Sequence, residues 1–224
     1  MSQNAASAAL LSKAISANHV APVFKQNAHI HLPPNFSAFD TVEQAVRLAA
    51  EQGIRLLGAS NYYDYNVYQP FAELANSKGI LPLFGLEIIA LLEDLQADGV
   101  KMNDPGNPGK LYLCGKAISK FSPMSPEATA MLQEIRDKDS SRMEAMAERM
   151  AAVFNEAGLT TGLNERVIIA RIAKRHGCNT STVYLQERHI AQAFQEVLFE
   201  MCDSDERARV LTRAFGNVPK SSME

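Results

Sequence analysis

The feature that most constrains the fold of this chain is a regular alternation of apolar runs and amphipathic helices over residues 20–90. An apolar lead-in up to Phe24 is followed by a predicted helix over 41–53, an apolar run over 54–59, a second helix over 67–77 and a longer apolar run over 80–89. Strands joined through helices run parallel, with right-handed crossovers. The first half of the sequence therefore predicts a parallel sheet or a β/α barrel.

His29 and His31 stand at the end of the first predicted strand, separated by Ile30. Side chains alternate along a strand, so the two histidines point the same way while Ile30 points into packing. Two neutral imidazoles on one face form half of a site for a divalent metal. The alternative is two unrelated histidines in a turn before Pro33 and Pro34.

Polar residues also occur after the second predicted strand and within the third. The loop after 54–59 contains Asn61, Tyr62 and Asp64, and Glu87 interrupts the apolar run over 80–89. A carboxylate in such a run needs a partner, either a metal or an arginine. The C-terminal ends of parallel strands share one edge of the sheet, where α/β proteins place their chemistry. One common site with the two histidines is therefore predicted.

Size and composition narrow the class of protein. The 224 residues fit one large domain or a domain with an insertion, and the net charge of -3 gives no field that favours nucleic acid or an anionic membrane. No apolar run is long enough to span a membrane. Cys114, Cys178 and Cys202 are odd in number and widely spaced, which argues against disulfides and favours a cytoplasmic location. Residues 1–18 are Ala/Ser-rich, lack a secretory signal and are expected to be a flexible tail.

The second half of the chain is predicted to be helical, which divides the sequence into a β/α portion over 19–121 and an all-helical lobe over 122–224. Helices are expected over 126–155 with a break near 137–141, over 165–175, from 179 or 180 to about 202, and over 204–214.

Over about residues 24–195 the sequence resembles the PHP (polymerase and histidinol phosphatase) metal-dependent phosphoesterases. Residues 27–31 are similar to the family's opening D-x-H-x-H, residues 60–62 stand where it has T-D-H, and residues 85–87 match its G-x-E. Residues 112–115 stand where a histidine commonly opens H-x-L-G. Residues 187–191 resemble the R-P-H-I-A-like segment in the helical insertion of one PHP branch, without its proline.

The resemblance implies a distorted, TIM-barrel-like β/α barrel whose site holds divalent metals, often zinc, manganese or iron. It implies that His29 and His31 hold one metal and that Glu87 bridges to a second. It also implies that Arg188 holds the phosphate of the substrate, a small phosphorylated compound or a nucleotide, and that His189 assists or donates a proton. In this family a metal-bound hydroxide attacks phosphorus.

Departures from the family pattern reduce the number of metal ligands expected in this chain. Asn61 and Tyr62 stand in place of an aspartate and a histidine near the metals, and Tyr112 replaces another ligand. Neutral amides and phenols are poor metal ligands, so Asp64, which is close by, is a candidate substitute. The predicted metal ligands are His29, His31 and Glu87, together with Asn61 and Asp64 as weaker candidates. The chain also ends before the later strands that carry the family's remaining ligands. Either the chain is a fragment of a longer barrel or the barrel is incomplete, and the two histidines and Glu87 are enough to hold one zinc.

The sequence thus predicts an α/β fold, a PHP-like partial barrel with an inserted helical lobe, and a metal-dependent hydrolase of the PHP phosphoesterase type. One alternative is a catalytically degenerate module that keeps the fold and binds without turnover. Another is a helix-turn-helix DNA-binding protein, since 172–184 reads as two helices about a glycine turn, with Arg171, Lys174 and Arg175 nearby. The long apolar second helix favours packing instead, so nucleic acid is the less favoured partner.

Overall fold

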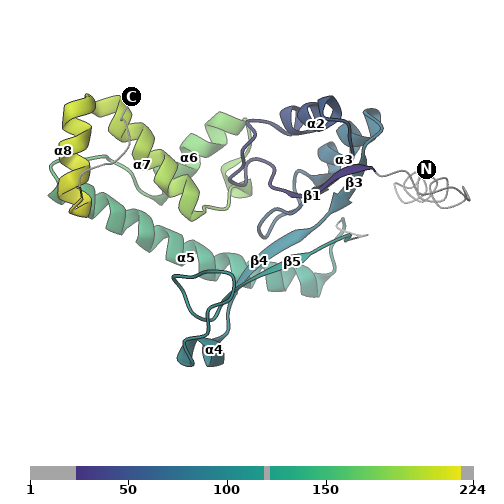
Figure 1. Cartoon of the computed structure of the whole chain (residues 1–224), viewed down its shortest axis with the longest axis horizontal. Coiled ribbons are helices and arrows are strands. Elements are labelled where there is room, and N and C mark those ends of the chain that lie inside the picture. The colour runs from purple at the N-terminus through teal and green to yellow at the C-terminus, as the bar shows by residue number, and fades with distance from the viewer. Residues whose placement is uncertain (1–23, 119–121, 218–224) are drawn as a thin grey trace, which may run out of the picture. The chain divides into compact units, whose positions relative to one another are not determined.

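The computed structural model describes residues 24–118 and 122–217, which form two compact units (Figure 1). The first unit contains the described chain up to Pro33 and Ser37–Thr129. The second contains Pro34–Phe36 and the described chain from Ala130 onward. The tail predicted over 1–18 and the apolar residues before Phe24 lie outside the described residues.

Two small sheets and three helices make up the first unit in its described part. The strands are β1 (Lys25–Ile30), β2 (Ile54–Ala59), β3 (Leu81–Phe84), β4 (Leu86–Leu91) and β5 (Lys110–Gly115), and the helices are α2 (Val42–Glu51), α3 (Tyr68–Ser77) and α4 (Glu93–Ala97). β1, β2 and β3 form a parallel sheet in that order, whereas β4 and β5 pair antiparallel in a second sheet. The strand–helix alternation thus gives the mixed α/β architecture that the sequence indicated, while the partial barrel stays a prediction.

The core of this unit is built from the parallel sheet and the two helices between its strands. The buried apolar side chains are Ile30, Leu32, Ala45, Val46, Ala49, Leu57, Ala59, Tyr68, Phe71, Ala75 and Ile80. α2 begins as its sequence predicts, because the Thr41 side chain accepts a hydrogen bond from the Gln44 N–H at 3.1 Å. Burial of one face of each helix against the sheet leaves the strand ends free for polar side chains.

The single third strand predicted over 80–89 is wrong, because the strand is interrupted at Gly85, between β3 and β4. The Gly85 N–H donates to the Ala59 carbonyl at 2.7 Å. A Cβ atom on Gly85 would lie 2.6 Å from both the Gly115 carbonyl oxygen and the Ser60 Oγ, so only glycine allows this approach. β3 belongs to the parallel sheet and β4 pairs antiparallel with β5, so the chain passes from one sheet to the other at this glycine.

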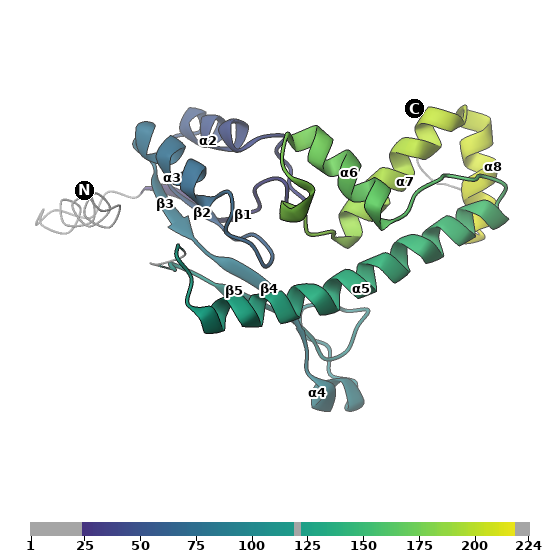
Figure 2. The same cartoon turned by 180° about the vertical axis from the view of Figure 1, so that it is seen from behind.

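The second unit is helical in its described part. Its elements are α5 (Pro126–Glu156, which begins in the first unit), α6 (Glu165–His176), the 3₁₀ turn η1 (Thr180–Thr182), α7 (Glu187–Met201) and α8 (Ser204–Phe215). The helices share one apolar core, to which Met143, Phe154, Ile168, Phe194 and Val210 contribute. Figure 2 shows α8 lying beside the C-terminal end of α5. Among the described residues, every helix is too short or too polar to cross a membrane.

The break predicted near 137–141 is wrong, because α5 runs unbroken through it. Side chains one turn apart support the helix there. Gln133 bonds Asp137 at 2.7 Å, and Lys138 pairs with Glu134 at 2.8 Å. Side-chain pairs four residues apart support a helix, which offsets the weak helical propensity of this polar segment.

The helix predicted from Asn179 or Thr180 to about Cys202 is also shorter than expected, since α7 begins at Glu187. Asn179 caps only the single turn of η1, and the chain then runs extended through Val183. Val183 and Leu185 are buried in the core of this unit. Packing of these two side chains outweighs helical continuation in this segment.

Replacing Gly58 by alanine tests how close β1 and β2 must lie. A Cβ atom on Gly58 would lie 2.5 Å from the Ala28 carbonyl oxygen of β1. We expect Gly58→Ala to destabilise the protein by about 1–3 kcal/mol, since the two backbones must separate. Urea unfolding followed by circular dichroism measures this. Gly115→Ala is the matched control, because its nearest atom would be 3.7 Å away; equal stability of the two variants would contradict the prediction.

Candidate metal centre

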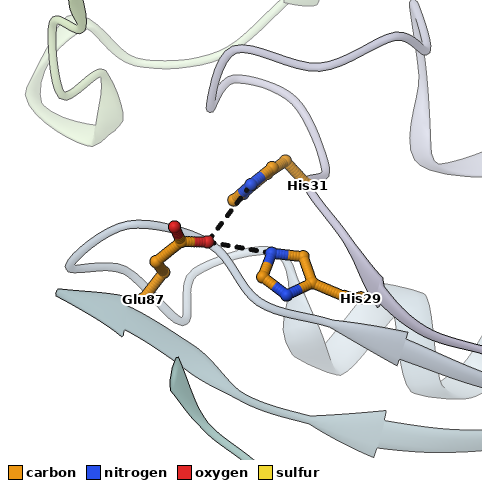
Figure 3. Close-up of side chains that lie close together, drawn as sticks. All are labelled: His29, His31 and Glu87. Carbon is orange, nitrogen blue, oxygen red and sulfur yellow. Dashed lines mark ion pairs between the residues drawn. The ribbon is translucent and has the colours of Figure 1, made fainter. Parts of the chain in front are cut away.

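His29, His31 and Glu87 point toward one another in the first unit (Figure 3). The His29 Nε2 lies 2.8 Å from the Glu87 Oε2, and the His31 Nε2 lies 3.4 Å from the same oxygen. One ligand atom from each residue lies within 4.8 Å of the others. Two imidazole nitrogens and one carboxylate oxygen are the donors of many zinc sites, so the three residues fit a divalent cation.

The backbone explains why these three side chains meet. His29 belongs to β1 and His31 follows its last residue, so both extend from one side while Ile30 is buried in the core. Glu87 is the second residue of β4, and its N–H donates to the Asn61 carbonyl at 3.1 Å. This bond and the parallel bridge between Glu87 and Tyr62 bring the start of β4 to the end of the parallel sheet.

Asn61, a predicted metal ligand, holds the chain after His31 instead. Its Oδ1 accepts from the Leu32 N–H at 2.7 Å, and its Nδ2 donates to the Leu32 carbonyl at 2.9 Å. The amide therefore pairs with both polar groups of one residue, which a carboxylate in its place would not do because it lacks a donor. The buried Tyr68 hydroxyl accepts from the Asn61 N–H at 2.8 Å and donates to the Gly85 carbonyl at 2.7 Å.

Asp64, the candidate substitute ligand, lies outside the cluster of His29, His31 and Glu87. It is 1% exposed, and its Oδ1 accepts from the Asn66 N–H at 2.9 Å. This is the bond of an Asx turn, which shapes the loop before α3. The structure thus brings together three of the five predicted metal ligands.

Tyr62 contacts two members of the cluster. Its hydroxyl donates to the Glu87 Oε1 at 2.8 Å, and its ring stacks on the His31 ring with centroids 5.0 Å apart and planes 6° from parallel. Burial, and then the hydrogen bond to Glu87, raise the pKa of Tyr62 well above its usual range. The phenol is therefore a neutral donor and supports the cluster without being one of its ligands.

Lys116 contacts the cluster and was missed by the sequence reasoning. Its Nζ lies 2.9 Å from the His29 Nδ1 and donates to the Ser60 Oγ at 2.7 Å and to the Ala28 carbonyl at 3.0 Å. One indication of this contact was present in the sequence, which is that Lys116 directly follows β5. The other residues of the cluster likewise lie near strand ends. An ammonium group thus borders the ring nitrogen of His29 that faces away from Glu87.

Arg188 and His189 belong to the helical unit. The Arg188 guanidinium lies 5.9 Å from the centre of the Phe36 ring, and the predicted contact of Arg188 with a substrate phosphate stays a prediction. His189 is 3% exposed, and its Nδ1 accepts from the Gln186 N–H at 3.2 Å, which caps α7. Burial, with smaller effects from His176 and Arg175, lowers the pKa of His189 to about 3. Its imidazole is therefore neutral near neutral pH, and the predicted role of His189 in assisting or donating a proton stays a prediction.

Two of the three basic residues that favoured DNA binding, Arg171 and Arg175, form ion pairs within the helical unit. Arg171 contacts Glu200 at 3.3 Å, and Arg175 contacts Glu196 at 2.6 Å. Residues 177–186 separate α6 from α7, which is longer than the short turn of a helix-turn-helix. These carboxylates on α7 would face DNA phosphates with like charge, so the helical unit offers little support for DNA binding.

The structure is similar to solved structures of two hydrolases. An amidohydrolase from Chromobacterium violaceum, with bound sulfate and no metal, matches with a TM-score of 0.51 at 21% identity over 77% of this chain and 50% of that chain. A protein from Bifidobacterium adolescentis, described as a candidate metal-dependent phosphoesterase, matches with a TM-score of 0.57 at 17% identity over 90% of this chain and 60% of that chain.

This chain therefore spans between half and three fifths of the length of these two proteins. No protein-family model and no curated protein sequence matches it significantly. At these identities the similarity shows the fold alone.

The buried His189 predicts how stability depends on pH. Its pKa is about 3 in the folded chain and 6.5 when solvated, so between these values the unfolded state binds the proton and the folded state does not. Stability should be complete above about pH 6.5 and should fall as the pH decreases toward 3, by on the order of 4 kcal/mol.

Urea unfolding between pH 4 and 8 measures this dependence, and His189→Asn should flatten its slope over that range. An NMR titration in which the His189 ring protonates with a midpoint above pH 5 would contradict the assignment.

Lys116 predicts an effect on metal affinity. An ammonium group only donates, so the His29 Nδ1 must accept and the ring proton must lie on Nε2, the nitrogen that a cation would need. Removing the donor frees Nδ1 to carry the proton, and we expect Lys116→Met to bind Zn²⁺ about tenfold more tightly by calorimetry. Lys110→Met, which removes a β5 lysine paired with Asp104, is the control of equal charge change. Equal affinities of the two variants would refute this role of Lys116.

Proposed function

We propose that this protein is a metal-dependent hydrolase of the PHP type that cleaves phosphate esters, with its cation held by His29, His31 and Glu87. The convergence of two imidazoles and a buried carboxylate on one point carries the proposal. The named activities of the two similar structures, an amidohydrolase and a candidate metal-dependent phosphoesterase, support hydrolysis as the reaction class.

A divalent cation at this point would supply Lewis acidity toward a phosphoryl oxygen and would acidify a bound water. Zinc, manganese and iron all suit these donors. The chain's own residues orient the ligands. Tyr62 fixes the Glu87 carboxylate through Oε1, and Asn61 fixes the chain after His31 through Leu32. Arg188 is the sequence-based candidate for holding the phosphate of a small phosphorylated substrate or a nucleotide.

A module that binds a metal without turnover is the second candidate. Asn61 and Tyr62 stand at positions where the resembled family has metal ligands. Here the Asn61 side chain is hydrogen-bonded to Leu32 and the Tyr62 hydroxyl to Glu87, which favours a module without turnover. Both candidates require the metal, so turnover distinguishes them.

The test measures hydrolysis of p-nitrophenyl phosphate and bis-p-nitrophenyl phosphate by the purified chain loaded with Zn²⁺, Mn²⁺ or Fe²⁺. We expect His29→Ala to reduce metal affinity by more than about a hundredfold, because loss of a ligand costs more than loss of the hydrogen-bond partner of a ligand. The same variant should abolish metal-stimulated hydrolysis. His176→Ala, which changes a histidine on α6, is the control and should leave both unchanged.

Metal binding without hydrolysis of either ester would favour the binding module. Absence of metal binding, or binding that His29→Ala leaves intact, would overturn both candidates.

A further inference from the structure

The two oxygens of the Glu87 carboxylate have different partners. Oε2 faces the imidazole nitrogens of His29 and His31, at 2.8 and 3.4 Å. Oε1 accepts the Tyr62 hydroxyl proton at 2.8 Å. A carboxylate that bridges two cations usually offers one oxygen to each. Here the second oxygen is already bonded to a neutral donor.

The Tyr62 ring is held in this position from several sides. It stacks on His31 and lies 5.9 Å from the Tyr63 ring, and the Tyr62 backbone bridges to Glu87. Tyr63 has a φ of 53°, a left-handed conformation that is uncommon for a bulky residue. Such a conformation persists only where packing imposes it, and Tyr63 is 3% exposed. The turn that directs Tyr62 toward Glu87 is therefore fixed by the fold.

The surroundings of the cluster also disfavour a second cation. Among the described residues, His29, His31 and Glu87 are the group of His, Cys, Asp and Glu side chains close enough to share an ion. The Asn61 amide is engaged by Leu32. On the far side of His29 the Lys116 ammonium lies 2.9 Å from Nδ1, where a further cation would meet a like charge.

We infer that Tyr62 is a positioning residue that directs Glu87 Oε2 toward the two imidazoles and limits the centre to one ion by occupying Oε1. This inference rests on the proposed metal centre and adds its stoichiometry and the residue that sets it. Tyr62 acts through Glu87, by a hydrogen bond from a neutral phenol.

The experiment measures bound Zn²⁺ per chain by elemental analysis and its affinity by calorimetry for the full chain and three variants. Tyr62→His replaces the phenol by an imidazole, which can ligate, and should raise the stoichiometry from one ion to two. Tyr62→Phe keeps the ring that stacks on His31 and loses only the hydroxyl, so it should keep one ion and bind it about tenfold more weakly. Tyr65→Phe removes a hydroxyl from the same loop and should behave as the unchanged chain.

Each outcome decides the inference. Two ions in the unchanged chain would overturn it while the proposed metal centre would stand, whereas no ion would overturn the centre itself. One ion in Tyr62→His would show that another feature sets the limit. A Tyr62→Phe affinity equal to that of Tyr65→Phe would remove the positioning role. Circular dichroism of all variants identifies any loss of fold, and Tyr62→Phe, the smallest change, keeps the test decisive if Tyr62→His unfolds.

Discussion

The Glu87 carboxylate is the group around which the first unit is arranged. It is 6% exposed, and a buried charge is costly unless polar groups surround it. Its partners come from two other segments, the end of β1 with its two histidines and the loop after β2 with Tyr62. Three stretches of chain must therefore end at one place. Gly58 and Gly85 permit this, since a side chain at either position would collide with neighbouring backbone.

Polar side chains that do not touch the carboxylate fix the loops that carry its partners. The Asn61 amide forms hydrogen bonds with both the N–H and the carbonyl of Leu32, as a neighbouring strand would. The Tyr68 hydroxyl accepts from the Asn61 N–H and donates to the Gly85 carbonyl. Both side chains are buried, where hydrogen bonds are stronger and an unmade one is expensive. The ligands are thus positioned by the packing of the unit, as a precise site requires.

The sequence predicted the parallel strands and the meeting of His29, His31 and Glu87, because both follow from periodicity and from the shared edge of parallel strand ends. The interruption of the strand at Gly85 was not predictable in this way, since an apolar run has the same pattern whether or not the chain changes sheets within it. The unbroken course of α5 depends on side-chain pairs that propensity does not count. The contacts of Tyr62 and Lys116 depend on the rotamers of long side chains from distant strands, which one sequence does not encode locally.

These two contacts decide the character of the proposed centre. Metal-binding side chains are usually backed by acceptors, which raise the basicity of the ligand and tighten the grip on the cation. Here the partners are donors, a phenol on Glu87 and an ammonium on His29. The two donors would act on metal binding in opposite directions. The phenol occupies Oε1 and directs Oε2 toward the imidazoles, so it favours binding of a cation, whereas the ammonium holds the ring proton of His29 on Nε2, so it opposes binding. The affinity of the proposed centre would thus depend on the balance between Tyr62 and Lys116.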